Sequence, residues 1–249
     1  MAIAIKSAQE IEKMRASGAI LRQVHHAVEQ AVKPGATTMD MERVAEAKIK
    51  ELGAKPAFKG YNNYPACLCT SVNNEVIHGI PSAKRILQEG DIVSVDCGVI
   101  LDGYYSDAAV TYPVGQISPQ TRKLLDVTKA SLEQAIQQVQ VGGTLGDVGA
   151  AVQEMCEAEG FGVVRDFVGH GIGKSMHEDP QVPNYGKRGK GTRLKAGMVL
   201  AIEPMINAGS ADVKVLKDGW TAVTVDGSMS AHFEHTVAVT KDGPLVLTR

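Results

Sequence analysis

The sequence predicts a mixed α/β protein built from two similar halves. Helical periodicity and strand-like apolar runs follow each other in the order helix, helix, strands, and this order occurs twice. Residues of the two passes also agree at a constant spacing. With 249 residues, 44% of them hydrophobic, the chain has the composition of a globular protein with a sizeable core.

The first half begins with two predicted helices. Ser7 and Glu10 match a capping box, and the apolar face that follows stops at Pro34-Gly35. A second helix is expected from about Thr38 to Leu52. Strand-like runs then occupy residues 67–72, 92–99 and 104–110.

The second half repeats this order. Ser118-Pro119 opens a long helix that Gly142-Gly143 ends, and a further helix runs to Gly160. Strands are expected over residues 198–206, 220–225 and 232–240.

Six pairs of residues separated by 107 positions indicate an internal duplication. The pairs match Gly35, Thr37, Asp40, Gly53, Gly90 and Asp96 with Gly142, Thr144, Asp147, Gly160, Gly197 and Glu203. No linker-like composition appears near the boundary at 112–118. We therefore expect a single domain over residues 1–249, with halves of about 1–112 and 113–249 that share one core.

Composition excludes several classes of protein. The net charge of -2 gives no polycationic surface for nucleic acid, and no basic run suggests a membrane-surface helix. The N-terminal apolar stretch is too short for a signal peptide, and no stretch reaches transmembrane length. The four cysteines lack zinc-type or redox spacing (Cys67 and Cys69 form only a lone C-x-C), so reduced cysteines in a cytoplasmic protein are expected.

Four carboxylates and one histidine stand out because they occur within or beside apolar segments. They are Asp96, Asp107, His170, Glu203 and Glu234. A buried, unpaired charge costs many kcal/mol, so such groups normally pair, neutralise or bind metal. A strand-end carboxylate in a salt bridge would explain any one of the acids alone. All five together predict a metal-binding shell.

A predicted hairpin brings the first two acids together. Asp102-Gly103 is a tight-turn signal, which would pair Leu101 with Tyr104 and place Gly98 opposite Asp107. Asp96 then becomes a diagonal neighbour of Asp107, with α-carbons about 7–8 Å apart. We expect Gly98 to leave space between the two side chains.

The second half supplies the remaining ligands. Glu203 shares a strand face with Val199 and Ala201, and Glu234 shares one with His232. His170 lies in a glycine-rich segment whose flexible backbone would present the imidazole.

The donor set favours two divalent ions. One histidine among oxygen donors suits manganese(II), iron(II), cobalt(II) or zinc, whereas histidine is a poor calcium ligand. Four negative charges balance two divalent cations, so a pair of ions is expected.

Several strings in order resemble the type I methionine aminopeptidases, over essentially the whole chain. They are NEVIHGIP (74–81), DIVSVDCGVILDGYYSD (91–107), GHGIG (169–173), HEDP (177–180), IEPM (202–205), KDGW (217–220) and EHT (234–236). The resemblance implies the pita-bread fold, in which two related halves with a curved antiparallel sheet, covered by helices, surround a dimetal crevice.

The resemblance also implies roles for the ligands. His170 and Glu203 would bind one ion and Asp96 the other, while Asp107 and Glu234 bridge both. A metal-bridging water or hydroxide would attack the first peptide bond, and Glu203 would handle its proton. Aminopeptidases are among the enzymes that use two metals in this way.

Further residues are implied at the substrate. His78 and His177 would hydrogen-bond the scissile peptide and the tetrahedral intermediate, although either alone reads as a surface histidine. The positions near the methionine pocket are Tyr61, Tyr64, Cys69, Met176 and Trp220. For Trp220 core packing is the alternative. His25 and His26 look like solvated helix residues, and His232 is a candidate for a supporting role beside the metal ligands.

Other proteins with this fold have features that this sequence does not show. Proline-specific aminopeptidases and creatinase-like hydrolases usually carry a long N-terminal domain, which is not expected here. Type II methionine aminopeptidases carry a long insert, whereas only 25 residues separate His177 from Glu203. A non-catalytic nascent-chain or ribosome-binding protein would be expected to have lost ligands, and all five are present.

The expected function is metal-dependent release of methionine from the N-termini of nascent polypeptides whose second residue is small. The second-residue preference comes from the resemblance alone. We expect a cytoplasmic monomer that associates transiently with the ribosome, without nucleic-acid specificity and without a membrane partner.

Overall fold

The computed structural model describes residues 3–249 as helices packed around antiparallel sheets. The helices are α1 (Ala8–Glu29), α2 (Thr38–Glu51), α3 (Pro119–Gln137) and α4 (Leu145–Ala158), with a short 3-10 helix at Tyr61–Asn63. The strands of the first half are β1 (Lys55–Pro56), β2 (Leu68–Val72), β3 (Glu75–Ile77), β4 (Ile92–Leu101) and β5 (Tyr104–Pro113). Those of the second half are β6 (Gly162–Val163), β7 (Gly169–Gly171), β8 (Glu178–Val182), β9 (Val199–Ile202), β10 (Met205–Asn207), β11 (Val213–Val215), β12 (Ala222–Thr224), β13 (Ser230–His232), β14 (His235–Thr240) and β15 (Gly243–Val246).

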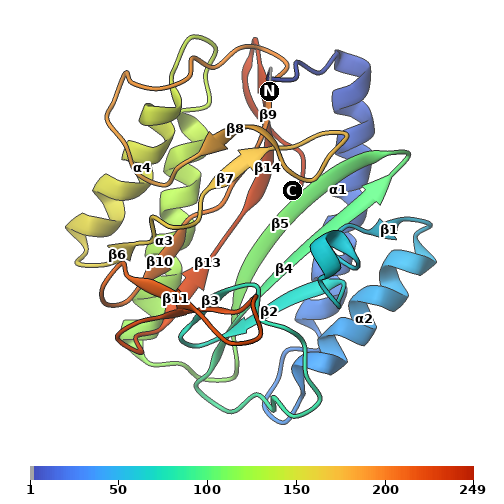
Figure 1. The fold of residues 1–249 in the computed structure, drawn as a ribbon, viewed down its shortest axis with the longest axis vertical. Coiled ribbons are helices and arrows are strands. Elements are labelled where there is room, and N and C mark those ends of the chain that lie inside the picture. The colour runs from blue at the N-terminus through green and yellow to red at the C-terminus, as the bar shows by residue number, and fades with distance from the viewer. Residues whose placement is uncertain (1–2) are drawn as a thin grey trace.

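The strands lie between two pairs of helices, α1 and α2 on one side and α3 and α4 on the other (Figure 1). One sheet has the order β1-β4-β2, with β5 also paired to β4, and another has the order β15-β14-β9-β7-β8. Two smaller sheets, β13-β10-β6 and β11-β12-β3, complete the fold. The long β4–β5 hairpin runs beside β14 through the middle of the molecule (Figure 1). The predicted mixed α/β class with curved antiparallel sheets is confirmed.

Local sequence signals explain the helix starts. Ser7 and Glu10 form the predicted capping box, and Ser118 caps the helix that begins at Pro119. The end of α1 was predicted too late, because the helix stops at Glu29. The N–H of Val32 bonds to the carbonyl of Glu29, three residues earlier, so the chain tightens into a turn before proline.

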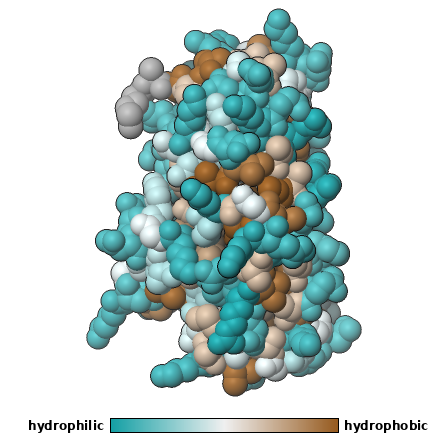
Figure 2. Space-filling view, turned by 90° about the vertical axis from the view of Figure 1, so that its right-hand side faces the viewer, coloured by the Kyte–Doolittle hydropathy of each residue, from teal (hydrophilic) through white to brown (hydrophobic). Residues whose placement is uncertain are grey.

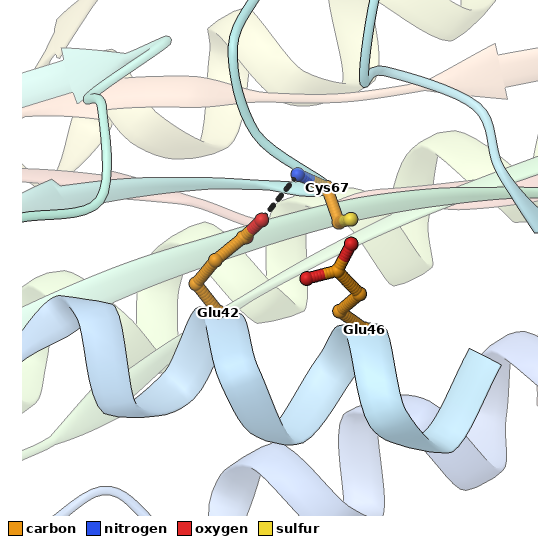
Figure 3. Close-up of side chains that lie close together, drawn as sticks. All are labelled: Glu42, Glu46 and Cys67. Carbon is orange, nitrogen blue, oxygen red and sulfur yellow. Dashed lines mark hydrogen bonds between the residues drawn. The ribbon is translucent and has the colours of Figure 1, made fainter. Parts of the chain in front are cut away.

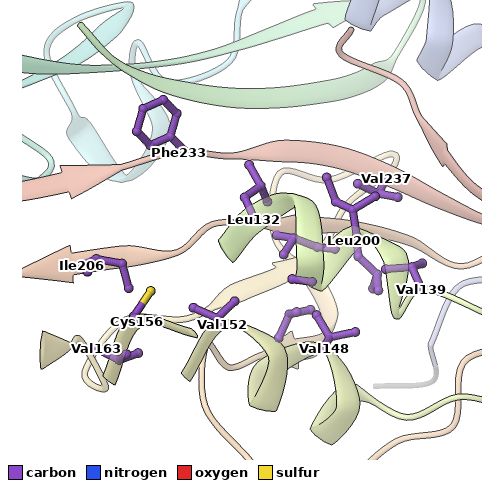
Figure 4. Packing of buried hydrophobic residues seen from close by; sticks show 14 of the residues in the cluster. Leu132, Val139, Val148, Val152, Cys156, Val163, Leu200, Ile206, Phe233 and Val237 are labelled. Carbon is purple, nitrogen blue, oxygen red and sulfur yellow. The ribbon is translucent and has the colours of Figure 1, made fainter. Parts of the chain in front are cut away.

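Each helix pair buries an apolar face against its own sheet. On one side α3 and α4 cover β9 and β14, where Leu132, Val152, Leu200 and Val237 pack together (Figure 4). On the other side α1 and α2 cover β2, β4 and β5. Between the two cores, β5 of the first sheet contacts β14 of the second.

Matched hydrogen bonding in the two halves supports the proposed duplication. Thr37 forms an isolated β-bridge with Ile86, and Thr144 forms one with Arg193, at the same separation of 107 positions. Each threonine also caps the helix that follows it through a capping box.

Two predicted strands are interrupted at a glutamate. The run 198–206 is divided into β9 and β10 at Glu203-Pro204, and the run 232–240 is divided into β13 and β14 at Phe233-Glu234. Proline lacks the N–H that a ladder needs, which explains the first break. The prediction that Glu203 and Glu234 lie on continuous strand faces was therefore wrong. Both residues lie at breaks between strands.

The face on the side of α1 and α2 is largely hydrophilic, and hydrophobic residues interrupt it mainly near its middle (Figure 2). Scattered exposed apolar side chains are normal for a folded protein. Within residues 3–249, no helix combines the length and apolar character needed to cross a bilayer.

Candidate metal centre

All five predicted ligands line one cavity of about 190 Å³. Asp96 lies on β4 and Asp107 on β5, whereas His170 lies on β7. Glu203 follows β9 and Glu234 precedes β14. Both halves of the chain therefore contribute side chains to the same site.

The β4–β5 hairpin has the predicted geometry. Asp102 and Gly103 both have positive φ, at 50° and 79°, as the tight turn requires. Gly98 faces Asp107 in the ladder, which makes Asp96 a diagonal neighbour of Asp107.

The expectation about Gly98 was wrong. A Cβ on this residue would lie 2.8 Å from Cε1 of Phe58 and 2.9 Å from Cβ of Ala57. The missing side chain makes room for the phenyl ring, which lines the cavity, and not for a gap between the aspartates.

His170 is held by regular structure, so the predicted flexible presentation was also wrong. Its strand, β7, pairs with both β8 and β9, and its Nδ1 lies 2.9 Å from the carbonyl oxygen of Gly171. Nε2 is left facing the site, 3.8 Å from Asp107 Oδ2 and 3.7 Å from Glu203 Oε1.

Three of the ligands form the tightest group. Ligand atoms of Asp107, His170 and Glu234 all lie within 4.8 Å of one another, and all three residues are buried. These ligand atoms are farther apart than hydrogen-bonded atoms but close enough to surround one point. This spacing leaves room for a cation between them.

Buried oxygen atoms without hydrogen-bond partners mark the same place. Among the described residues, Oδ1 of Asp96, Oδ1 of Asp107 and Oε1 of Glu234 have none. Buried polar atoms nearly always have a hydrogen-bond partner, so a cluster of buried oxygen atoms without one indicates a binding site for a further group. Oxygen donors with one imidazole fit a hard or borderline divalent cation.

Electrostatics point to the same conclusion. Burial raises the pKa of Asp96 to about 7. Burial and the Glu234 carboxylate hold the pKa of Asp107 well above its usual value, and burial with Asp107 does the same for Glu203. Burial and Glu203 raise the pKa of Glu234 as well. A cation would remove the repulsion that raises these pKa values.

The predicted histidines border the cavity. His177 is exposed at its edge, where Nδ1 lies 2.8 Å from the hydroxyl of Tyr61, so this tyrosine orients the ring. His78 adopts a left-handed backbone with φ of 60° and meets Trp220 edge to face. Burial lowers the pKa of His78 to about 4. The part of the His177 ring that is packed against the cavity is desolvated, which also lowers its pKa, so both imidazoles are neutral near pH 7.

The predicted placement of two other histidines is supported for His232 and wrong for His25. Nε2 of His232 is buried without a hydrogen-bond partner among the described residues and lies 3.7 Å from Glu203 Oε2, which places it beside the site. His25 is buried, contrary to its predicted solvation. Its ring nitrogens contact the hydroxyl of Tyr112 and the carbonyl oxygen of Ala108.

An apolar wall completes the cavity. All five predicted pocket residues line it: Tyr61, Tyr64, Cys69, Met176 and Trp220. The sequence reasoning missed Phe58 and Asn62, which also line the cavity. Phe58 precedes the short 3-10 helix and Asn62 lies in it, in a stretch without apolar periodicity. Burial keeps the Cys69 thiol protonated by raising its pKa.

A second group of possible ligands consists of Glu42, Glu46 and Cys67 (Figure 3). Both oxygens of Glu42 already accept backbone N–H groups, from Cys67 at 2.7 Å and Leu68 at 2.9 Å, and so cap the start of β2. Glu46 is exposed and paired with Lys59. Burial raises the pKa of the Cys67 thiol to about 12, which disfavours the thiolate that metals need. This group is explained by structure alone.

A larger surface depression of about 700 Å³ lies near the start of α4, against the loop 183–192. It lacks a group of close metal-ligating atoms among the described residues. The chemistry of the chain is therefore concentrated in the smaller cavity.

Comparison with known proteins gives consistent matches. The model of metallopeptidase family M24 matches residues 12–241. A methionine aminopeptidase of Clostridium acetobutylicum is 54% identical over 246 residues, which cover 99% of this chain and 98% of that protein. The crystal structure of a methionine aminopeptidase from Thermotoga maritima superposes with a TM-score of 0.98 at 49% identity, over 100% of both chains. A prolidase from Pyrococcus horikoshii shares the fold alone, with a TM-score of 0.80 and 24% identity, and the match covers 98% of this chain and 63% of the prolidase.

Proposed function

The chain belongs to the methionine aminopeptidases of metallopeptidase family M24, divalent-metal hydrolases that remove N-terminal methionine, and we propose that its acidic cavity binds two metal ions. The observation that carries the proposal is the convergence of five potential ligands from both halves on one cavity. Four carboxylates balance the charge of two divalent ions, of which manganese(II), iron(II), cobalt(II) and zinc suit these donors.

Each ligand is assigned a place in this pair of sites. His170 and Glu203 would bind one ion, Asp96 would bind the other, and Asp107 and Glu234 would bridge both. The separation of 3.7 Å between His170 Nε2 and Glu203 Oε1 supports the first assignment. The bridging assignment is supported by the close grouping of Asp107 and Glu234 and by their orphaned oxygen atoms.

When bound, the two ions lower the pKa of a bound water and stabilise negative charge on the scissile carbonyl oxygen. Glu203 accepts a proton at its carboxylate and returns it to the departing amine. Its Oε1 lies 3.7 Å from His170 Nε2, at the proposed metal centre, so the carboxylate is within reach of a proton released there.

His78 and His177 bind the substrate peptide. Because both imidazoles are neutral near pH 7, each can donate an N–H to the peptide or to the carbonyl oxygen as it gains charge. Tyr61 fixes the ring of His177 at the edge of the cavity.

The apolar wall holds the methionine side chain. Tyr64 turns only its ring to the cavity, because its hydroxyl lies 2.9 Å from the carbonyl oxygen of Leu68. Met176 and Cys69 give soft, polarizable surface that suits a thioether. The proposed preference for a small second residue in the substrate rests on the resemblance to the type I enzymes.

We propose that the substrates are nascent polypeptides in the cytoplasm. The enzyme acts as a monomer, as a single catalytic domain with duplicated halves, and associates transiently with the ribosome. Its four buried, free cysteines agree with a reducing compartment.

A peptide assay tests this function. Metal-free protein is supplied with manganese(II) or cobalt(II) and a Met-Gly-x tripeptide, and free methionine is measured by chromatography. We expect release from Met-Gly-x, much less from Met-Leu-x, and none when the α-amine is acetylated.

Glu203→Gln is the matched variant, because it keeps the shape of the side chain and removes the proton acceptor. Binding of the tripeptide without hydrolysis by the metal-loaded wild type would favour the non-catalytic nascent-chain protein instead.

A further inference from the structure

The outer edge of β5 faces the second half of the protein. Among the described strands, β5 pairs in register only with β4. Its other edge makes single hydrogen bonds instead, such as that from Glu234 N–H to the carbonyl oxygen of Ala109. We call the contact of Asp107, Ala109 and Thr111 with residues 232–236 the junction.

At one end of the junction a threonine hydroxyl bonds the backbone groups of β5 that a neighbouring strand would otherwise bond. The hydroxyl of Thr236 accepts the N–H of Asp107 at 3.0 Å and donates to the carbonyl oxygen of Asp107 at 2.8 Å. Both residues are buried. One hydroxyl from the second half therefore fixes the backbone of a proposed bridging ligand from the first half.

At the other end the same arrangement occurs in reverse. The hydroxyl of Thr111, from the first half, accepts the N–H of His232 and donates to its carbonyl oxygen, both at 2.8 Å. The hydroxyl of Ser94 lies 2.8 Å from that of Thr111 and adds support from β4. The ring of His232 in turn lies beside Glu203.

We propose that Thr111 and Thr236 are positioning residues that lock the two halves at the junction, so that Asp107 and Glu234 meet at one metal centre. Glu234 lies between the two hydroxyl contacts, and Asp107 is held by one of them. Each hydroxyl satisfies a buried N–H and a buried carbonyl at once, a role that an apolar side chain of the same shape cannot fill.

This inference rests on the proposed metal-binding function of the cavity. It differs from a purely structural role, in which loss of either hydroxyl would lower stability without changing metal affinity. Partners that orient metal ligands typically change metal affinity or activity by about 10–100-fold when they are removed.

The test measures metal binding separately from turnover. Purified metal-free wild type and the variants Thr236→Val and Thr111→Val are titrated with manganese(II) by calorimetry, and the absorption spectrum of the cobalt(II) form is recorded. Thr128→Val is the matched control, because Thr128 is also a buried threonine, but its hydroxyl bonds within α3, to the Leu124 carbonyl.

We expect both junction variants to bind manganese about 10–100-fold more weakly and to show an altered cobalt(II) spectrum. Thr128→Val should retain wild-type values, and Thr236→Ser should restore them because it keeps the hydroxyl. If Thr236→Val does not fold, Thr236→Ser and Thr236→Cys still test the inference. Serine keeps the hydroxyl, whereas the thiol of cysteine is a weaker hydrogen-bond donor and acceptor, so manganese affinity should be retained in the serine variant and fall in the cysteine variant.

Wild-type metal affinity in Thr236→Val and Thr111→Val, or a flat series from Thr to Ser to Cys, would overturn the inference while leaving the metal centre intact. Failure of the wild type itself to bind divalent ions would instead overturn the proposed function.

Discussion

Lowering the pH from 7 to 5 should destabilise the metal-free protein through His25. This residue is buried on α1, with Nε2 2.9 Å from the Ala108 carbonyl oxygen and Nδ1 3.3 Å from the Tyr112 hydroxyl. Burial lowers the pKa of His25 to about 4 from the ordinary value of 6.5. The folded state therefore resists protonation that the unfolded chain accepts.

The sign and size of the effect follow from linkage. Well above pH 6.5 the imidazole is neutral in both states and does not affect the free energy of unfolding. As the pH falls towards 4, the unfolded state binds a proton that the folded state does not, so stability is lost. With these two pKa values, the loss between pH 7 and 5 is about 2 kcal/mol.

Urea unfolding in the presence of a chelator measures this loss at each pH. His25→Gln serves as the comparison, because an amide can contact the same carbonyl and hydroxyl but does not titrate. We expect the free energy of unfolding of the wild type to fall by about 2 kcal/mol more than that of the variant. Equal pH dependence in the two proteins would refute the assignment of a buried, neutral His25.

Three further predictions concern the site. Asp107→Asn or Glu234→Gln should abolish methionine release and weaken metal binding, because we propose that each carboxylate bridges both ions. Near-normal rates at saturating metal would refute the bridging assignment. Gly98→Ala should lower the free energy of unfolding by about 1–3 kcal/mol, because the new Cβ would displace Phe58. Since Phe58 lines the cavity, KM should also rise, while the metal affinity measured by calorimetry should stay unchanged. Activity should fall as acid protonates the ligands and should recover with added manganese(II), since protons and metal compete for the same atoms; a rate that metal does not rescue would contradict this.

Local signals in the sequence were sufficient for much of the fold. Ser7 with Glu10 located the start of α1, and Asp102-Gly103 gave the register that places Asp96 and Asp107 as diagonal neighbours. Both signals act over a few residues, where turn and capping chemistry determines the backbone.

Long-range packing could not be predicted in the same way. His25 reads as a solvated helix residue because its partners, Ala108 and Tyr112, are more than 80 residues away. The junction hydroxyls of Thr111 and Thr236 have no sequence signature either. Their role becomes visible only when β5 lies beside the second half of the protein.

The metal content of the protein tests the central claim most directly. Titration of chelator-treated wild type with manganese(II) or cobalt(II) should give two bound ions per chain, the number that we propose from the four carboxylates of the cavity. Asp107→Asn should lose tight binding of both. Wild-type protein that binds no divalent ion, or an Asp107→Asn variant that binds both ions with unchanged affinity, would contradict the account.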